Sequence, residues 1–270
     1  MSATREIIPL PGCALDATKS FGQPVSMVVR GGDFIFVSGL TAVDLQSGER
    51  MRGTTASETR QILTNLNQLL EAAGSSLDKV VKVNVLLHSM LEAANMNDVY
   101  ARFFPDPAPA RTVCGARLPD GVKVIIECTA LWHDSMTEKL QRSAIEPSNP
   151  LLNASRSSNL PHVPGVHVGD YIFLSGMVPI DPKTGERSHG PIAEQVRTTL
   201  SNMQHMLQSA GSSLERVVRV HVVLADISHM AEMDRVYREF FPIDPPARTA
   251  WSMQLRFGNG CEIECVALAG

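Results

Sequence analysis

The sequence predicts an α+β protein built from two tandem copies of one domain, each with the element order β-β-α-β-α-β-β. The first observation is an internal repeat. When the two halves of the sequence are aligned without gaps, Pro109-Ala110-Arg111-Thr112 falls on Pro246-Ala247-Arg248-Thr249. The second observation is that each copy alternates short β-branched runs with two longer amphipathic stretches. A period this long indicates a duplicated domain, because solenoid units run to roughly 20–50 residues.

The offset between the two copies does not change along the chain. It aligns residues 32–39 with residues 169–176, both Gly-Asp followed by an aromatic-rich run and Ser-Gly, and it aligns Ala-Gly-Ser-Ser-Leu at 73–77 with the same sequence at 210–214. We therefore expect three segments, a first domain, a linker rich in Ser, Asn and Pro, and a second domain. Their expected bounds are 20–132, 133–156 and 157–270.

Each element of the first copy follows from a local pattern. The strands are expected at 25–29, 33–38, 80–87, 111–118 and 122–131, and the helices at 54–73 and 91–103. Gly74 ends the first helix, Pro105 and Pro107 end the second, and a turn at 119–121 joins the last two strands. The second copy repeats every element, and a short helix is expected at 135–142 in the linker.

Composition and charge exclude several classes of protein. Apolar residues make up 44% and charged residues 19%, which is typical of a globular protein, and the net charge of −4 gives no basic stripe for nucleic acid. No apolar run approaches the roughly 20 residues of a membrane span, and the first residues lack the apolar core of a secretion signal. We therefore expect a cytoplasmic protein that binds neither nucleic acid nor membrane.

Cysteine and histidine usage indicates a reducing compartment and no metal. The five cysteines are odd in number and form no Cys-x-x-Cys pair, so a disulfide framework is not expected. The eight histidines show neither His-x-x-x-His nor His-Glu-x-x-His spacing, so we expect no metal site.

The repeated arginine is the first candidate for function. Arg111 and Arg248 each stand at the beginning of a predicted strand, directly after a proline-containing segment. A guanidinium group held there can bind both oxygens of a carboxylate. The alternative is a structural arginine that holds its loop through backbone carbonyl groups.

Several motifs taken together resemble the RidA family of reactive intermediate deaminases. They are Ser-Gly after the second strand, Ala-Gly-Ser-Ser-Leu, Tyr-x-x-Phe-Phe and Pro-Ala-Arg-Thr, each present in both copies. The resemblance implies a fold similar to bacterial chorismate mutase, rings of three domains, and clefts between neighbouring domains. It also implies hydrolysis of imines and enamines of 2-amino acids to keto acids and ammonia without a cofactor. For this chain it predicts a homotrimer acting on a small carboxylate.

The resemblance also implies the catalytic residues. Arg111 and Arg248 match the family arginine that holds the substrate carboxylate, and Glu262 matches the glutamate that positions water. Ile125 takes that position in the first copy, so the second copy, with Arg248 and Glu262, is expected to be the active one. His162 falls on the family tyrosine and is a candidate proton donor. The alternatives are a surface carboxylate for Glu262 and an ordinary loop histidine for His162.

The remaining candidates are expected to contact the substrate rather than to react with it. These substrate-binding positions are Arg111, Arg248, Ser175, Asp234, Ser38 and Asn97. If each ring holds one kind of copy, Arg248 lies with Glu262, whereas mixed rings pair the arginine of one copy with residues of the other.

Three functions are compatible with these residues. The first is a RidA-like deaminase that converts an imine or enamine of a carboxylate-bearing molecule to the keto compound. The second is another cofactor-free enzyme on the same fold, acting on a carboxylated intermediate of aromatic catabolism or natural-product metabolism. The third is a non-catalytic small-molecule-binding protein. The altered cleft residues favour the second over the first.

Overall fold

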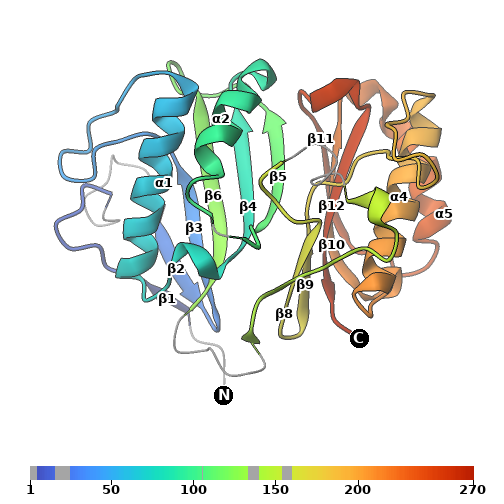
Figure 1. Cartoon of the computed structure of the whole chain (residues 1–270), viewed down its shortest axis with the longest axis horizontal. Helices are drawn as coiled ribbons and strands as arrows, with labels where there is room; N and C mark the ends of the chain where they lie inside the picture. Colours follow the sequence, from blue (N-terminus) through green and yellow to red (C-terminus); the bar gives the residue numbers. More distant parts are fainter. Residues whose placement is uncertain (1–4, 16–24, 105, 133–139, 154–159) are drawn as a thin grey trace. The chain divides into compact units, whose positions relative to one another are not determined.

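The structure of the chain is a computed structural model, which describes residues 5–15, 25–104, 106–132, 140–153 and 160–270. These residues form two compact units (Figure 1). The first unit contains Met1–Asp106 and Ala116–Gln141, and the second contains Pro107–Gly115 and Arg142–Gly270. Each unit combines a sheet with two long helices, which confirms the predicted α+β fold with two tandem domains.

The strands of the first sheet are ordered β1-β2-β3-β6-β4-β5. Their bounds are Arg5–Ile7 (β1), Val28–Gly31 (β2), Phe34–Leu40 (β3), Val80–Leu87 (β4), Ala110–Gly115 (β5) and Val124–Leu131 (β6). The helices are α1 (Thr55–Ala72) and α2 (Ala93–Tyr100). Strand β5 lies within the segment that belongs to the second compact unit.

Helix α1 forms where the apolar spacing predicts it. Thr54 caps its first turn by accepting a hydrogen bond from the backbone N–H of Ser57, and Gly74 ends it with a φ of 71°, a value that glycine adopts without strain. The apolar residues Ile62, Leu66, Leu69 and Leu70 are buried along one face of the helix. Burial of each such side chain contributes about 1.5–3 kcal/mol to folding.

The strands of the second sheet are ordered β11-β10-β12-β9-β8-β7, with β10 and β11 parallel. Their bounds are Ser143–Ala144 (β7), Gly165–Val168 (β8), Tyr171–Leu174 (β9), Val217–Leu224 (β10), Ala247–Ser252 (β11) and Cys261–Leu268 (β12). Helices α4 (Ile192–Ser209) and α5 (Met230–Phe240) contact each other and lie on the same side of this sheet (Figure 1). The core between them includes Val196, Leu200, Met203, Leu207, Val220, Val222, Met233, Val236 and Ile263.

The segment 133–156, expected to be a linker, contributes a strand to the second sheet. Ser143 and Ala144 of β7 pair antiparallel with His167 and Val166 of β8. In the alignment of the two copies, β7 corresponds to β1, which pairs with β2 in the same way. The repeated sheet therefore begins before residue 20 in the first copy and before residue 157 in the second. Residues 135–139 of the short helix expected in the linker lie outside the described residues.

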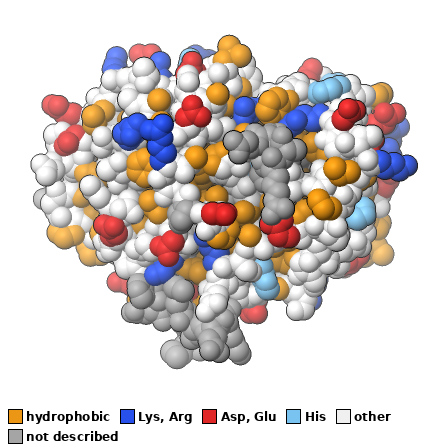
Figure 2. Space-filling model, viewed as in Figure 1, with side chains coloured by type: hydrophobic (Ala, Val, Ile, Leu, Met, Phe, Trp, Pro, Cys, Tyr) orange, Lys and Arg blue, Asp and Glu red, His pale blue; other side chains and the backbone are white. Residues whose placement is uncertain are grey.

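Charged side chains of both signs are mixed over the face of the molecule shown in Figure 2. None of the helices in the described part of the chain is both long and apolar enough to span a membrane. All five cysteines are free thiols. Cys128, Cys261 and Cys265 are buried in the sheets, and burial raises the pKa of the Cys261 thiol to about 12.

Candidate active site

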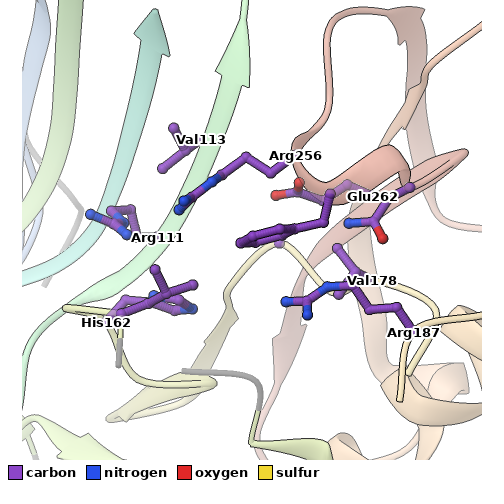
Figure 3. Close-up of a pocket in the computed structure, with 11 residues that line it drawn as sticks. Arg111, Val113, His162, Val178, Arg187, Arg256 and Glu262 are labelled. Atoms are coloured by element: carbon purple, nitrogen blue, oxygen red, sulfur yellow. The ribbon is translucent and has the colours of Figure 1, made fainter. Parts of the chain in front are cut away.

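A pocket in the second unit gathers several of the expected site residues. The space that these residues enclose, about 510 Å³, includes part of the open solvent at the mouth of the pocket. Every residue that lines it belongs to the second compact unit. The lining residues are Arg111, Val113, Leu160, His162, Gly176, Val178, Arg187, Arg256, Phe257, Asn259 and Glu262 (Figure 3).

Arg111 is held in place through its backbone. Its N–H donates to Ser175 Oγ at 2.8 Å, and its carbonyl oxygen accepts from the N–H of Gly176 at 3.0 Å. The Ser175 hydroxyl in turn donates to the carbonyl oxygen of Val163 at 2.5 Å, next to the parallel bridge between Val163 and Ala110. Arg111 is only 4% exposed, so a carboxylate that reaches its guanidinium group is bound away from bulk water.

Glu262 projects from β12 against the backbone of Gly176. It is 8% exposed, and a Cβ atom at position 176 would overlap its carboxylate. The beginning of β12 is fixed by the N–H of Gly260, which donates to Gln195 Oε1 of helix α4 at 2.7 Å. Glycine at 176 therefore leaves the space that the Glu262 carboxylate occupies.

Two further arginines border the pocket, and both contact the Phe257 ring. Arg187 Cζ lies 4.2 Å and Arg256 Cζ lies 4.5 Å from the ring centroid. Arg187 ends a turn in which the N–H of Asp181 donates to the carbonyl oxygen of Glu186 at 2.8 Å. Phe257 has a φ of 57°, a left-handed conformation that is unusual for a bulky residue. Such strained positions cluster at functional sites.

His162 lines the same pocket from the segment before β8, where its backbone N–H donates to the carbonyl oxygen of Leu160 at 2.9 Å. Figure 3 shows Arg111 and His162 on one side of the pocket and Glu262 and Arg187 on the other, with the side chain of Arg256 extending between them. The structure thus brings together Arg111, His162 and Glu262, with Ser175 supporting the arginine.

Arg248 is not among the residues that line this pocket. Its guanidinium group forms an ion pair with Asp234 of helix α5, with Nη2 at 2.7 Å from Oδ1, and lies over the Tyr237 ring at 4.7 Å. Burial raises the pKa of Tyr237 to about 12, although the positive charge of Arg248 opposes the rise. Within the chain, Glu262 therefore lines a pocket with Arg111 and not with Arg248.

Ser38 and Asn97 lie in the first unit. The Ser38 hydroxyl donates to the carbonyl oxygen of Ser26 at 2.8 Å, as Ser175 does to Val163 in the second unit. Asn97 is buried on helix α2. Next to Ser38, a Cβ atom at Gly39 would lie 2.9 Å from Ile125 Cγ2, so the apolar Ile125 occupies the place that Glu262 takes in the second copy.

Sequence reasoning did not single out Arg187, Arg256, Phe257 or Asn259. Comparison of the two copies could have pointed to Arg256, Phe257 and Asn259. When the two copies are aligned, the run from Arg256 to Asn259 falls on 119–122, Pro-Asp-Gly-Val. Only Gly258 is shared with the first copy, as Gly121, so the arginine, the aromatic ring and the asparagine of this turn occur in the second copy alone.

Comparison with known proteins extends over nearly the whole chain. The model of a family described as Endoribonuclease L-PSP matches residues 14–132 and again residues 154–269. A RutC family protein of Pyrococcus horikoshii is 41% identical over 116 residues, which is 43% of this chain and 91% of that protein.

Two further relatives match at the length of one domain. A human 2-iminobutanoate/2-iminopropanoate deaminase is 35% identical over 111 residues, covering 41% of this chain and 81% of that protein. The crystal structure of the yeast protein YEO7 aligns with a TM-score of 0.44 and 30% identity, covering 48% of this chain and all of that chain. The family model matches two successive segments that together make up most of the chain, which places the protein in the Endoribonuclease L-PSP family as a tandem member of the RidA type.

Proposed function

We propose that the pocket lined by Arg111, His162 and Glu262 hydrolyses an imine or enamine of a carboxylate-bearing small molecule to the keto compound and ammonia. The observation that carries the proposal is the joint presence of a buried arginine, a buried glutamate and a histidine around one small pocket. The relative named 2-iminobutanoate/2-iminopropanoate deaminase supports the same chemistry.

Arg111 is the group that binds the substrate carboxylate. Its backbone is fixed by Ser175 and Gly176 and its side chain is buried, so it loses less conformational freedom on binding than an exposed arginine would. A charged hydrogen bond from a buried guanidinium group contributes about 1.5–3 kcal/mol. Bound in this way, the imine carbon is held in one orientation relative to Glu262.

The reaction consumes one water molecule. Glu262 orients this water and accepts a proton from it as the water oxygen forms a bond to the imine carbon, and His162 donates a proton to the imine nitrogen. In the tetrahedral intermediate the amino nitrogen takes up the proton held by Glu262 and the carbon–nitrogen bond breaks. The hydroxyl proton passes to His162 as the carbonyl forms and ammonia leaves, which restores both side chains to their starting states. An enamine first takes up a proton at carbon and then follows the same steps.

Ammonia release from an imine made in solution tests the proposal. An amino-acid oxidase acting on 2-aminobutyrate or on a dicarboxylic amino acid supplies the imine, and the purified chain is expected to accelerate ammonia release above the rate in buffer. Glu262→Gln is expected to lower this acceleration by about 100-fold or more, the usual contribution of a general base. If neither a monocarboxylic nor a dicarboxylic imine is hydrolysed faster than in buffer, the proposal is wrong.

We further propose that the chain assembles as a homotrimer through strand β11. Strand β5 is the equivalent of β11 in the first copy. Its edge is bonded to Ser175 through the Arg111 N–H and bridged to Val163 through Ala110, and Arg111 and Thr112 are buried. Strand β11 presents the same sequence on the outer edge of its sheet, and its residues 247–249 are exposed. In a second copy of the chain, Ser38 stands where Ser175 stands for β5, and three chains joined head to tail by this contact can close a symmetric ring.

Light scattering of the purified chain is expected to give a mass near three times 29.3 kDa. Arg248→Pro removes the N–H that corresponds to the Arg111 N–H bonded to Ser175, so it is expected to lower the mass. Arg248→Gln retains that N–H and should leave the mass unchanged. A monomeric or dimeric wild-type chain would show that β11 does not serve as this interface.

Two features of the chain complete the proposal. All five cysteines are free, which supports a reducing compartment such as the cytoplasm. The domains are proposed to span 20–132 and 157–270 around the linker 133–156, with the short strands β1 and β7 added to their sheets.

A further inference from the structure

The pocket is lined by more positively charged side chains than are needed to bind one carboxylate. Three of its lining residues are arginines, Arg111, Arg187 and Arg256, and among those lining residues Glu262 is the acidic one. The backbone of Arg111 fixes it beside Ser175, and the other two arginines come from loops that follow β9 and β11. A monocarboxylate bound at Arg111 therefore leaves a positive pocket wall.

Phe257 holds the two loop arginines together. Both guanidinium carbons lie within 4.5 Å of its ring centroid, so cation–π attraction to the ring offsets part of the cost of bringing the two charges close. Burial lowers the pKa of both guanidinium groups, and the charge of Arg187 lowers the pKa of Arg256 further, whereas Glu262 raises it. A site of this kind is stabilised by an anion between the two cations.

We propose that Arg187 and Arg256 bind a second carboxylate, so that the preferred substrate is the imine of an amino dicarboxylic acid. This inference rests on the proposed function of the same pocket and adds the class of substrate. The carboxylate next to the imine carbon binds Arg111, and the distal carboxylate binds the two arginines at Phe257. Water still adds to the imine carbon and ammonia still leaves, so the distal carboxylate takes no part in the chemistry.

The comparison of the two copies supports a specialised role for this pair. In their alignment, Arg187 falls on Arg50, whereas Arg256 and Phe257 fall on Pro119 and Asp120. The first copy therefore has one arginine, no aromatic ring and an acidic residue at these positions. It also has Ile125 in place of Glu262, so the second anion site and the catalytic glutamate occur in the same copy.

Two keto acids of equal length test the inference by binding alone. 2-Oxoglutarate and 2-oxopentanoate both have five carbons and differ in the terminal carboxylate. Calorimetric titration of the full chain is expected to give a Kd at least about tenfold lower for 2-oxoglutarate, because a charged hydrogen bond contributes that much or more. Arg256→Gln and Arg187→Gln are each expected to reduce this preference to less than about threefold, since each removes one of the two partners.

The control is Arg235→Gln on helix α5, which removes the same charge from a side chain that is 70% exposed. It should keep the full preference, and thermal melting should show that the variants are folded. Equal binding of the two keto acids by the wild-type chain, or the same loss of preference in the control, would overturn the inference.

Measurements of imine hydrolysis distinguish a failure of this inference from a failure of the proposed function. Imines made from glutamate and from norvaline are compared by their kcat/KM values. If both are hydrolysed equally well, the inference fails and the proposed function stands. If neither is hydrolysed but the preference for 2-oxoglutarate is lost in Arg256→Gln, the second anion site stands and the proposed function fails.

Discussion

Arg111→Gln is expected to lower kcat/KM for imine hydrolysis by about 100-fold or more, because it removes charged hydrogen bonds that contribute about 1.5–3 kcal/mol each. Arg248→Gln is expected to change kcat/KM by less than about threefold. The two arginines occupy the same position in the repeat, but only Arg111 lines the pocket that contains Glu262. Arg248 instead forms an ion pair with Asp234.

The measurement is steady-state hydrolysis of an imine generated in solution, with light scattering to confirm that neither variant alters the assembly. Each substitution keeps a long polar side chain and removes one positive charge, so the two variants are a matched pair. Equal losses for Arg111→Gln and Arg248→Gln would show that both arginines serve active clefts. A larger loss for Arg248→Gln would restore the pairing that the sequence alone favours.

The secondary structure could be predicted closely where one local pattern determines it. The helix expected at 54–73 is α1, Thr55–Ala72, because Thr54 supplies the N-cap and Gly74 the left-handed end. The strand expected at 80–87 is β4 with the same bounds, because its alternate β-branched residues are buried.

Where two local structures compete, the prediction was less accurate. The helix expected to begin at Leu91 begins at Ala93, after a 3-10 turn over Met90–Glu92. Ser89 accepts a hydrogen bond from the N–H of Leu91, and Leu91 itself is exposed, so this apolar residue does not mark the buried face. Strand β7 was missed because its two residues acquire a strand conformation only by pairing with β8.

The residues of the candidate site also include some that the sequence identifies and some that it does not. His162 and Glu262 could be found because the repeat and the family resemblance assign each position separately. The sequence did not decide between Arg111 and Arg248 as their partner, because the repeat places Arg248 and Glu262 in one copy but leaves open a contact with the arginine of the other copy. Arg187 and Arg256 lie on loops, where neither periodicity nor a shared motif identifies a side chain that faces a pocket.

Gly176→Ala is expected to reduce imine hydrolysis about as strongly as Glu262→Gln, by about 100-fold or more, although it removes no functional group. The added Cβ would overlap the Glu262 carboxylate, so the carboxylate must leave its present position. Displacement of a catalytic group by about 1 Å is sufficient for a loss of this size. The measurement is kcat/KM together with the Kd for 2-oxoglutarate, which is expected to change much less because Arg111, Arg187 and Arg256 remain.

The first copy supplies the matched control. Gly39 corresponds to Gly176, and a Cβ atom at position 39 would lie 2.9 Å from Ile125 Cγ2, so Gly39→Ala also crowds the side chain at the position equivalent to Glu262. Both variants should lower the melting temperature, because both force a buried neighbour to shift. Only Gly176→Ala should abolish turnover, since only there is the displaced neighbour a carboxylate that orients water. Full activity in a folded Gly176→Ala variant would show that the position of the Glu262 carboxylate does not determine the rate.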